Sequence, residues 1–257
     1  MKILINGICG HMGREVLSLC EAGYRGAECI GGVDAFSKGG ETYVVYRDFA
    51  EVPEAQIDCI VDFSHHTVTP ALLDFAIARG IPTVLCTTGH TPEEKAKIAL
   101  AAEKIPLFFS ANMSLGVALL VELAKQACAA FPEAEIEIIE KHHDRKVDAP
   151  SGTALMLADA LCEVRPEATV NCGRSGQGKR TQSEIGIHAI RMGNIVGEHE
   201  VMIGTPNQTI TLKHEAHSRA LFAEGALAAA AFLVGCEAGL YDMKSLVSGA
   251  KSPQTVG

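Results

Sequence analysis

The chain has 257 residues, of which 47% are hydrophobic and 21% are charged, and its formal net charge is −9 at pH 7. This length allows one large domain or two ordinary ones, and the composition is that of a globular protein and not of a disordered or fibrous one. The negative charge disfavours nucleic acid and anionic membranes as partners, and no apolar run reaches the roughly 20 residues of a membrane-spanning helix, so we expect a cytoplasmic protein.

The first part of the chain alternates short apolar segments with segments of helical spacing. We expect strands at residues 2–6, 28–33, 57–63, 83–87 and 106–110, with helices at 12–22, 69–79 and 92–104 between them. Helices between strands are typical of right-handed crossovers that join parallel strands. We therefore predict an α/β fold class for residues 1–113, with a Rossmann-like, doubly wound parallel sheet.

The pattern changes from residue 114. We expect a long helix at 114–131, a half-buried strand at 134–140, a helix from Pro150, strands at 184–191, 195–203 and 209–216, an alanine-rich helix at 220–234 and a turn at 239–242. Gly or Pro-Asn turns between the later strands favour antiparallel pairing. The sequence therefore predicts a smaller α+β domain with a mainly antiparallel sheet.

The turn after the first strand is a candidate phosphate site. Gly7-Ile8-Cys9-Gly10-His11-Met12-Gly13 has G-x-x-G-x-x-G spacing, whereas G-x-G-x-x-G is commoner. Residues without Cβ let the backbone approach a pyrophosphate, and the following helix N-terminus supplies amide donors and a positive dipole. A structural turn is the alternative interpretation, but the position between a strand and a helix favours dinucleotide binding.

An acidic residue at the end of the second strand supports this interpretation. The Asp34 carboxylate can accept hydrogen bonds from both hydroxyls of an adenosine ribose and would repel a 2′-phosphate. Ala35 brings no cation beside it. We therefore expect NADH to be favoured over NADPH, although Lys38 could pair with a 2′-phosphate.

The stretch from Glu140 to Thr153 is the most informative part of the sequence. In an acidic protein it gathers two histidines and three cations, directly before a helix; these are Lys141, His142, His143, Arg145 and Lys146. The cations and the first helical amides, at Gly152 and Thr153, would bind a small carboxylate. Histidine titrates near neutral pH and can carry protons. The alternative interpretation is a solvated basic loop.

Two motifs that mimic other sites are rejected. Residues 173–180 resemble a P-loop, but Arg180 stands where a magnesium-binding Ser or Thr is needed, and a strand follows in place of a helix. His214-Glu215-Ala216-His217 is one residue short of the zinc motif H-E-x-x-H. We expect no metal site.

Together these motifs resemble the 4-hydroxy-tetrahydrodipicolinate reductase (dihydrodipicolinate reductase) family over essentially the whole chain. The most specific part is the string His-His-x-x-Lys-Val-Asp-Ala-Pro-Ser-Gly-Thr-Ala that begins at His142. The other matching segments are residues 7–13, 62–64, 87–89, 110–114, 191–199 and 217–226.

The resemblance implies a reaction and a set of site residues. The reaction is reduction of (4-hydroxy-)dihydrodipicolinate to tetrahydrodipicolinate by hydride transfer from NAD(P)H, in the diaminopimelate route to lysine. His142 would be the general acid/base and Lys146 the proton donor, while His143, Gly152 and Thr153 would bind the substrate carboxylates. The implied cofactor-binding residues are Gly7, Ile8, Cys9, Gly10, His11, Met12, Asp34, Cys86, Thr87, Thr88, Ser110, Ala111, Asn112 and Met113.

The resemblance also implies an organisation. Residues 1–113 and 223–257 would form the dinucleotide-binding domain, and residues 114–222 would bind substrate and build a homotetramer. Two alternative functions stay open: another two-domain NAD(P)-dependent dehydrogenase, which the glycine loop and Asp34 alone would permit, and a dinucleotide sensor without catalysis. Neither alternative explains proton donors beside a carboxylate site.

Overall fold

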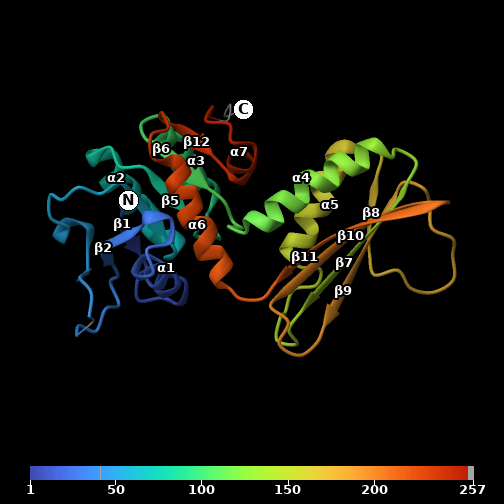
Figure 1. The fold of residues 1–257 in the computed structure, drawn as a ribbon, viewed down its shortest axis with the longest axis horizontal. Coiled ribbons are helices and arrows are strands. Elements are labelled where there is room, and N and C mark those ends of the chain that lie inside the picture. The colour runs from blue at the N-terminus through green and yellow to red at the C-terminus, as the bar shows by residue number, and fades with distance from the viewer. Residues whose placement is uncertain (41, 254–257) are drawn as a thin grey trace. The chain divides into compact units, whose positions relative to one another are not determined.

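The computed structural model describes residues 1–40 and 42–253, so the end of the predicted segment 223–257 lies outside the described residues. Contacts divide the chain into two units, each a sheet covered by helices (Figure 1). Unit 1 is Met1–Leu115 with Ala220–Gly257, and unit 2 is Gly116–Arg219. No helix in the described part of the chain is long and apolar enough to cross a membrane.

Unit 1 is built on a seven-stranded sheet in which all neighbouring strands are parallel. In spatial order the strands are β12 (Gly239–Tyr241), β6 (Pro106–Phe109), β5 (Thr83–Leu85), β4 (Cys59–Asp62), β1 (Lys2–Asn6), β2 (Glu28–Val33) and β3 (Val45–Tyr46). The chain winds outward from β1 in both directions, so the switch point lies between β1 and β4. This arrangement confirms the predicted Rossmann-like fold class.

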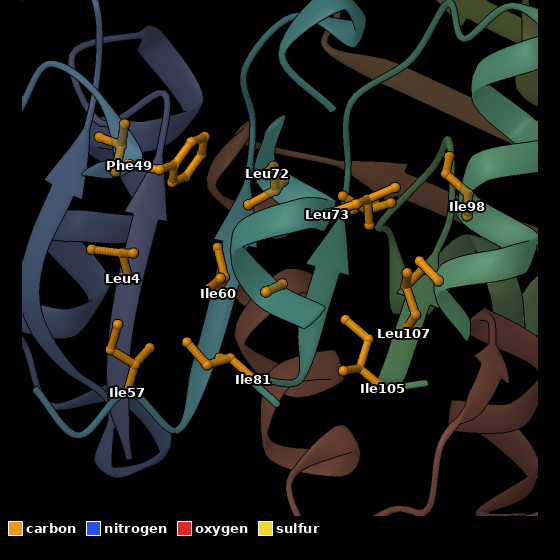
Figure 2. Packing of buried hydrophobic residues seen from close by; sticks show 14 of the residues in the cluster. Leu4, Phe49, Ile57, Ile60, Leu72, Leu73, Ile81, Ile98, Ile105 and Leu107 are labelled. Atoms are coloured by element: carbon orange, nitrogen blue, oxygen red, sulfur yellow. The ribbon is translucent and has the colours of Figure 1, made fainter. Parts of the chain in front are cut away.

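Helices cover both faces of this sheet. Figure 2 shows the core on one face, where α2 (Thr69–Arg79) and α3 (Pro92–Ala102) meet alternate strand residues; among the side chains drawn are Leu4, Ile60, Leu72, Leu73, Ile98 and Leu107. Phe108, whose side chain points away from that face, contacts Phe232 of α6 (Ala220–Leu233), so α6 covers the other face. Helix α1 (His11–Glu21) packs beside α6.

Unit 2 contains a five-stranded sheet, which is mixed. In spatial order its strands are β11 (Gln208–Ala216), β10 (Gly197–Thr205), β7 (Glu135–His142), β9 (Glu184–Arg191) and β8 (Thr169–Cys172). The antiparallel pairing expected from the short turn between β10 and β11 is present, and β10 is also antiparallel to β7. The other pairs, β7 with β9 and β8 with β9, are parallel. Helix α5 (Gly152–Val164) carries the chain back between β7 and β8, and the segment 173–183 carries it back between β8 and β9.

The core of unit 2 lies between one face of the sheet and the helices α4 (Leu115–Ala130) and α5. Strand β7 buries every second side chain, Ile136, Ile138, Glu140 and His142, on that face. Two isoleucines in this series belong to the core, whereas the last two positions are polar. The alternation therefore carries a carboxylate and an imidazole into the interior.

Several elements differ from the sequence prediction. The expected turn at 239–242 is wrong, since Gly239–Tyr241 forms β12 beside β6. Strands β3 and β8, helix α7 (Met243–Ser248) and three single-turn 3₁₀ helices were not predicted; the last are Tyr24–Gly26, Phe49–Glu51 and His66–Val68. All of these are too short to show a hydrophobic period.

Candidate active site

The segments predicted to hold a dinucleotide all follow strands of the parallel sheet. Residues 7–13 follow β1, Asp34 follows β2, residues 86–88 follow β5 and residues 110–113 follow β6. In a parallel sheet the carboxyl ends of the strands meet at one edge, and ligands bind there at the switch point. The fold therefore brings the four segments to the same edge of unit 1.

The glycine loop is tightly closed by its own backbone. Gly7 has a φ of 80°, and the amide of Gly10 donates to Gly7 O over 3.0 Å. A Cβ on Gly7 would lie 2.7 Å from Phe63 O, and a Cβ on Gly13 would lie 2.1 Å from Gly7 O. No side chain in the described part of the chain caps α1 at Gly10. Amide donors are therefore left at this helix N-terminus for phosphate oxygens, so the residues present fit a dinucleotide.

Asp34 joins the end of β2 to the glycine loop. Its Oδ2 accepts from the Cys9 amide over 3.0 Å, and its Oδ1 accepts from the Phe36 amide over 3.0 Å. These two bonds hold the carboxylate in place, and each oxygen keeps a further lone pair for a ribose hydroxyl. Ala35 and Lys38, which follow it in the chain, are both exposed.

Two buried polar side chains fix the carboxyl ends of β1 and β4. The carboxylate of Asp62 accepts from Asn6 Nδ2 over 2.8 Å, from Ser64 Oγ over 2.6 Å and from the Ser64 amide over 3.1 Å. Burial raises the pKa of Asp62 above its ordinary value despite these bonds. The network ties the glycine loop's strand to the segment that begins at Phe63.

A hollow of about 220 Å³ opens at this edge, lined by Met12, Phe63, Cys86, Ala111, Met113 and Phe222. Four of these residues were predicted to bind the cofactor, whereas Phe63 and Phe222 were only part of matching motifs. Burial raises the pKa of the Cys86 thiol well above its ordinary value, so the side chain is an apolar wall and not a nucleophile.

The remaining cofactor candidates of unit 1 shape the rim of this edge. Thr87 is buried and Thr88 exposed. Ser110 Oγ donates to Asn112 O over 2.8 Å and accepts from the Asn112 amide over 3.2 Å. These bonds fold the segment 110–113 into a turn, which presents Ala111 and Met113 to the hollow.

Unit 2 contains a second candidate site, centred on Glu140. Its Oε1 accepts from the Ser151 amide over 2.9 Å and from Arg191 Nη2 over 2.7 Å. Its Oε2 lies 2.6 Å from His142 Nδ1 and accepts from Arg191 Nη1 over 2.8 Å. The carboxylate is fully buried, and its charge is balanced by the guanidinium. The sequence assigned no role to Glu140 or Arg191; the one available signal was an acidic residue at an inward position of the β7 alternation.

These contacts set the charge states of the site. Burial raises the pKa of Glu140, but hydrogen bonds from Arg191 and His142 outweigh it, so the pKa lies below its ordinary value. Burial lowers the pKa of His142, and the hydrogen bond and charge of Glu140 offset this effect only in part. The positive charges of Lys146 and Arg191 lower the pKa further. At neutral pH, Glu140 is therefore ionised and His142 is neutral.

The cations of the loop are paired with acids, which the sequence did not predict. Lys141 Nζ lies 2.9 Å from Glu198 Oε2, and Lys146 Nζ lies 2.8 Å from Asp148 Oδ1. Arg145 pairs with its neighbour Asp144. Because Asp148 is 58% exposed, its pair with Lys146 is weak, and an anionic ligand can replace that carboxylate.

The N-terminus of α5 lies in the same unit as these groups. Ser151 caps the helix by accepting from the Ala154 amide over 3.2 Å, while its own amide is held by Glu140. A Cβ on Gly152 would meet nothing within 4 Å in the described structure. The His143 amide donates to Ile195 O over 2.7 Å, and its ring Nδ1 is buried without a partner among the described residues. The open space at Gly152 and the ring of His143 agree with donors for a carboxylate, whereas the role of Thr153 stays a prediction.

His199 of β10 lies behind His142, with 5.1 Å between the ring centroids. Its Nε2 lies 3.1 Å from Ser151 Oγ, which also caps α5. Burial lowers the pKa of His199 from 6.5 to about 4. The folded protein therefore holds this imidazole neutral at neutral pH.

This shift predicts a loss of stability in weak acid. Between pH 6.5 and about 4 the unfolded chain binds a proton at His199 that the folded chain does not, so the free energy of unfolding falls as the pH falls through this window. The contribution is about 3 kcal/mol. Urea unfolding of the wild type and of His199→Gln at both ends of the window checks it. We expect the variant to show the smaller dependence on pH, and equal dependence in the two proteins would contradict the assignment.

Both units match models of the same protein family. A family model described as dihydrodipicolinate reductase, N-terminus, matches residues 1–113, and one described as dihydrodipicolinate reductase, C-terminus, matches residues 116–247. A curated relative from Caldanaerobacter subterraneus subsp. tengcongensis, named 4-hydroxy-tetrahydrodipicolinate reductase, is 45% identical over 96% of this chain and 98% of the relative. A relative of the same name from Clostridium novyi is 41% identical over 96% of this chain and 98% of its own length.

Solved structures share the fold. A dipicolinate-bound dihydrodipicolinate reductase from Paenisporosarcina sp. TG-14 has a TM-score of 0.80 and 24% identity, and the match covers 94% of this chain and 97% of the other. A DAP dehydrogenase from C. glutamicum in complex with DAP has a TM-score of 0.61 and 14% identity, with 100% and 97% covered. The same fold therefore occurs in a dihydrodipicolinate reductase and in a DAP dehydrogenase.

Proposed function

The chain belongs to the dihydrodipicolinate reductase family, and on that basis we propose that it reduces (4-hydroxy-)dihydrodipicolinate to tetrahydrodipicolinate in the diaminopimelate route to lysine. It is an NAD(P)H-dependent oxidoreductase. The observation that carries the proposal is the cluster of His142, Lys146 and the α5 N-terminus in unit 2, which offers proton carriers beside donors for carboxylates. A general dehydrogenase or a sensor would not need this combination.

The dinucleotide is held by unit 1. The glycine loop, from Gly7 to Met12, would bind the pyrophosphate, and Asp34 would bind the adenosine ribose. The segments 86–88 and 110–113, which line or border the apolar hollow, would hold the nicotinamide end. When bound, the dihydronicotinamide supplies a hydride to a ring carbon of the substrate.

Unit 2 holds the substrate and supplies the proton. His143, Gly152 and Thr153 bind the two carboxylates, assisted by the positive end of the α5 dipole. Lys146 exchanges Asp148 for the anionic substrate and donates a proton to the carbon next to the site of reduction. His142, neutral at pH 7, accepts and returns protons through Nε2. The proton and the hydride together add H₂ across one double bond of the ring.

One assay separates this function from the two alternatives. The purified chain is mixed with NADH and the freshly generated cyclic imine, and dinucleotide oxidation is followed by absorbance. The reductase oxidises NADH only when the imine is present. A sensor binds NADH without oxidising it, and a different dehydrogenase oxidises it with other carbonyl compounds but not with the imine. Either of these results would exclude the proposed reaction.

We propose that NADH is used at least as well as NADPH. The Asp34 carboxylate is held beside Cys9, where it would repel a 2′-phosphate, and Ala35 brings no compensating cation. Kinetics with both dinucleotides should give a kcat/KM for NADH equal to or above that for NADPH. Asp34→Asn, which removes the charge and keeps an acceptor, should shift the ratio toward NADPH. A wild-type preference for NADPH of tenfold or more would overturn this proposal.

The proposed assembly is a cytoplasmic homotetramer formed through the sheet of unit 2. Helices α4 and α5 cover one face of that sheet. On the other face, Ile139, Ile190 and Met202 contribute apolar side chains, and Ile190 is 40% exposed. An apolar surface of this kind, among polar neighbours, is typical of an interface between subunits.

A further inference from the structure

We propose that Glu140, clamped by Arg191, is a positioning residue that fixes the ring of His142 with its Nδ1 proton buried and leaves Nε2 as the nitrogen that exchanges protons. This inference rests on the proposed role of His142 and deepens it. It assigns a task to two residues that the sequence left without one.

The contacts of Glu140 define the proton position on His142. An ionised carboxylate only accepts hydrogen bonds, so the 2.6 Å contact with His142 Nδ1 requires the proton to be on that nitrogen. The neutral ring then has its lone pair on Nε2. The other three contacts to Glu140, two from Arg191 and one from the Ser151 amide, occupy its remaining acceptor positions. The carboxylate therefore has no freedom to turn away from the imidazole.

Arg191 is itself held in place. Its Nη2 donates to Asp148 O over 2.6 Å in addition to Glu140. In the β7–β9 ladder, Arg191 is the register partner of His142, so the parallel pairing of these strands brings the guanidinium to the carboxylate. Two hydrogen bonds from one planar group also fix the orientation of the carboxylate plane. Arg191 thus orients His142 through Glu140.

Gly197 leaves room at the exchanging nitrogen. It is the first residue of β10, and a Cβ there would lie 3.1 Å from His142 Nε2. Such a contact would crowd the lone pair that the proposal assigns to proton exchange. The absence of a side chain at this position therefore agrees with a free Nε2, independently of the contacts at Nδ1.

The charged and titratable groups around His142 come from four elements. Glu140 lies on its own strand, Arg191 on β9 and His199 on β10, while Lys146 lies in the loop before α5. Glu140 stabilises the protonated ring, whereas Arg191 and Lys146 destabilise it. Removing Glu140 or Arg191 must therefore change the pKa of His142 in opposite directions. A general loss of folded structure would not shift the pKa of His142 in opposite directions in the two variants.

The test measures the His142 ring directly by ¹⁵N NMR in protein labelled with ¹⁵N-histidine, with the His142→Gln variant identifying its signals. In the wild type we expect a pyrrole-like Nδ1 and a pyridine-like Nε2 at neutral pH. Glu140→Gln should lower the pKa of His142 and mix the two tautomers, and Arg191→Gln should raise it, each by about one unit. Arg191→Lys keeps the positive charge and should restore a pKa closer to that of the wild type.

A matched control and turnover complete the experiment. Arg174→Gln removes a guanidinium that pairs with Glu184, at the opposite end of β9, and should leave the His142 signals unchanged. In the imine assay, Glu140→Gln should lower kcat about 10- to 100-fold with an unchanged KM for NADH, and the acid limb of its pH profile should follow the NMR pKa.

Shifts of the His142 pKa in the same direction for Glu140→Gln and Arg191→Gln, or no shift in either, would overturn the proposal, as would a wild-type proton on Nε2. If Glu140→Gln does not fold, the test rests on the other two variants. The pKa of His142 must then rise in Arg191→Gln and return toward the wild-type value in Arg191→Lys. The titration needs no turnover. A wild type inactive on the imine would therefore refute the proposed function while the positioning role is still tested.

Discussion

His142→Gln and Lys146→Ala are each expected to lower kcat by roughly 10²–10⁴. In the proposed mechanism both residues act on protons that move only as the substrate is reduced, so their loss would remove an interaction made in the transition state. An interaction of that kind affects kcat and leaves the KM for the dinucleotide close to the wild-type value. Steady-state kinetics with NADH and the freshly generated imine measure both constants.

The pH dependence separates the two residues. Because the pKa of His142 lies below its ordinary value, the neutral ring is present at pH 7, and activity should fall only when the pH drops below that lowered pKa. This acid limb should disappear in His142→Gln and persist in Lys146→Ala. Lys141→Ala provides the control, since it removes a cation of the same segment that pairs with Glu198. Near-normal kcat in both His142→Gln and Lys146→Ala would show that protons are supplied by other groups.

The elements that the sequence predicted well are those with a local signal. Helix α2 has the predicted bounds because Pro70 lies in its first turn and Gly80, with a φ of 63°, ends it. Strand β9 also has its predicted bounds. In contrast, β12 is three residues long and exists because β6 offers an edge for pairing. Nothing in a three-residue segment carries that information.

The same distinction holds for the candidate site. The glycine loop and the segment from His142 to Thr153 are continuous in sequence, so residue types and spacing reveal them. The Glu140–Arg191 contact joins residues 51 positions apart and depends on the register of β7 with β9. The ion pairs of Lys141 and Lys146 likewise depend on how the chain folds back. The residue types alone show only the positive charges of this segment, so they overestimate its local positive potential.

The second large effect is expected in the glycine loop of unit 1, which is proposed to bind the dinucleotide. Gly13→Ala should weaken the affinity for NADH by at least ~10²-fold, because a Cβ at this position would lie 2.1 Å from Gly7 O and 2.7 Å from Ile8 Cα. Both obstructing atoms belong to the backbone, so the loop itself must move. Losing two charge-assisted hydrogen bonds to phosphate, at about 1.5 kcal/mol each, accounts for the expected change.

Calorimetric titration with NADH measures this affinity, and thermal unfolding measures the accompanying overpacking, which should cost about 1–3 kcal/mol. Gly178→Ala is the control, since a Cβ there would meet nothing within 4 Å in the described structure. A folded Gly13→Ala protein that binds NADH within threefold of the wild type would show that phosphates do not contact this loop. The reverse result, lost NADH binding with an unchanged ¹⁵N titration of His142, would place the defect in unit 1 alone, because the imidazole and its partners all belong to unit 2.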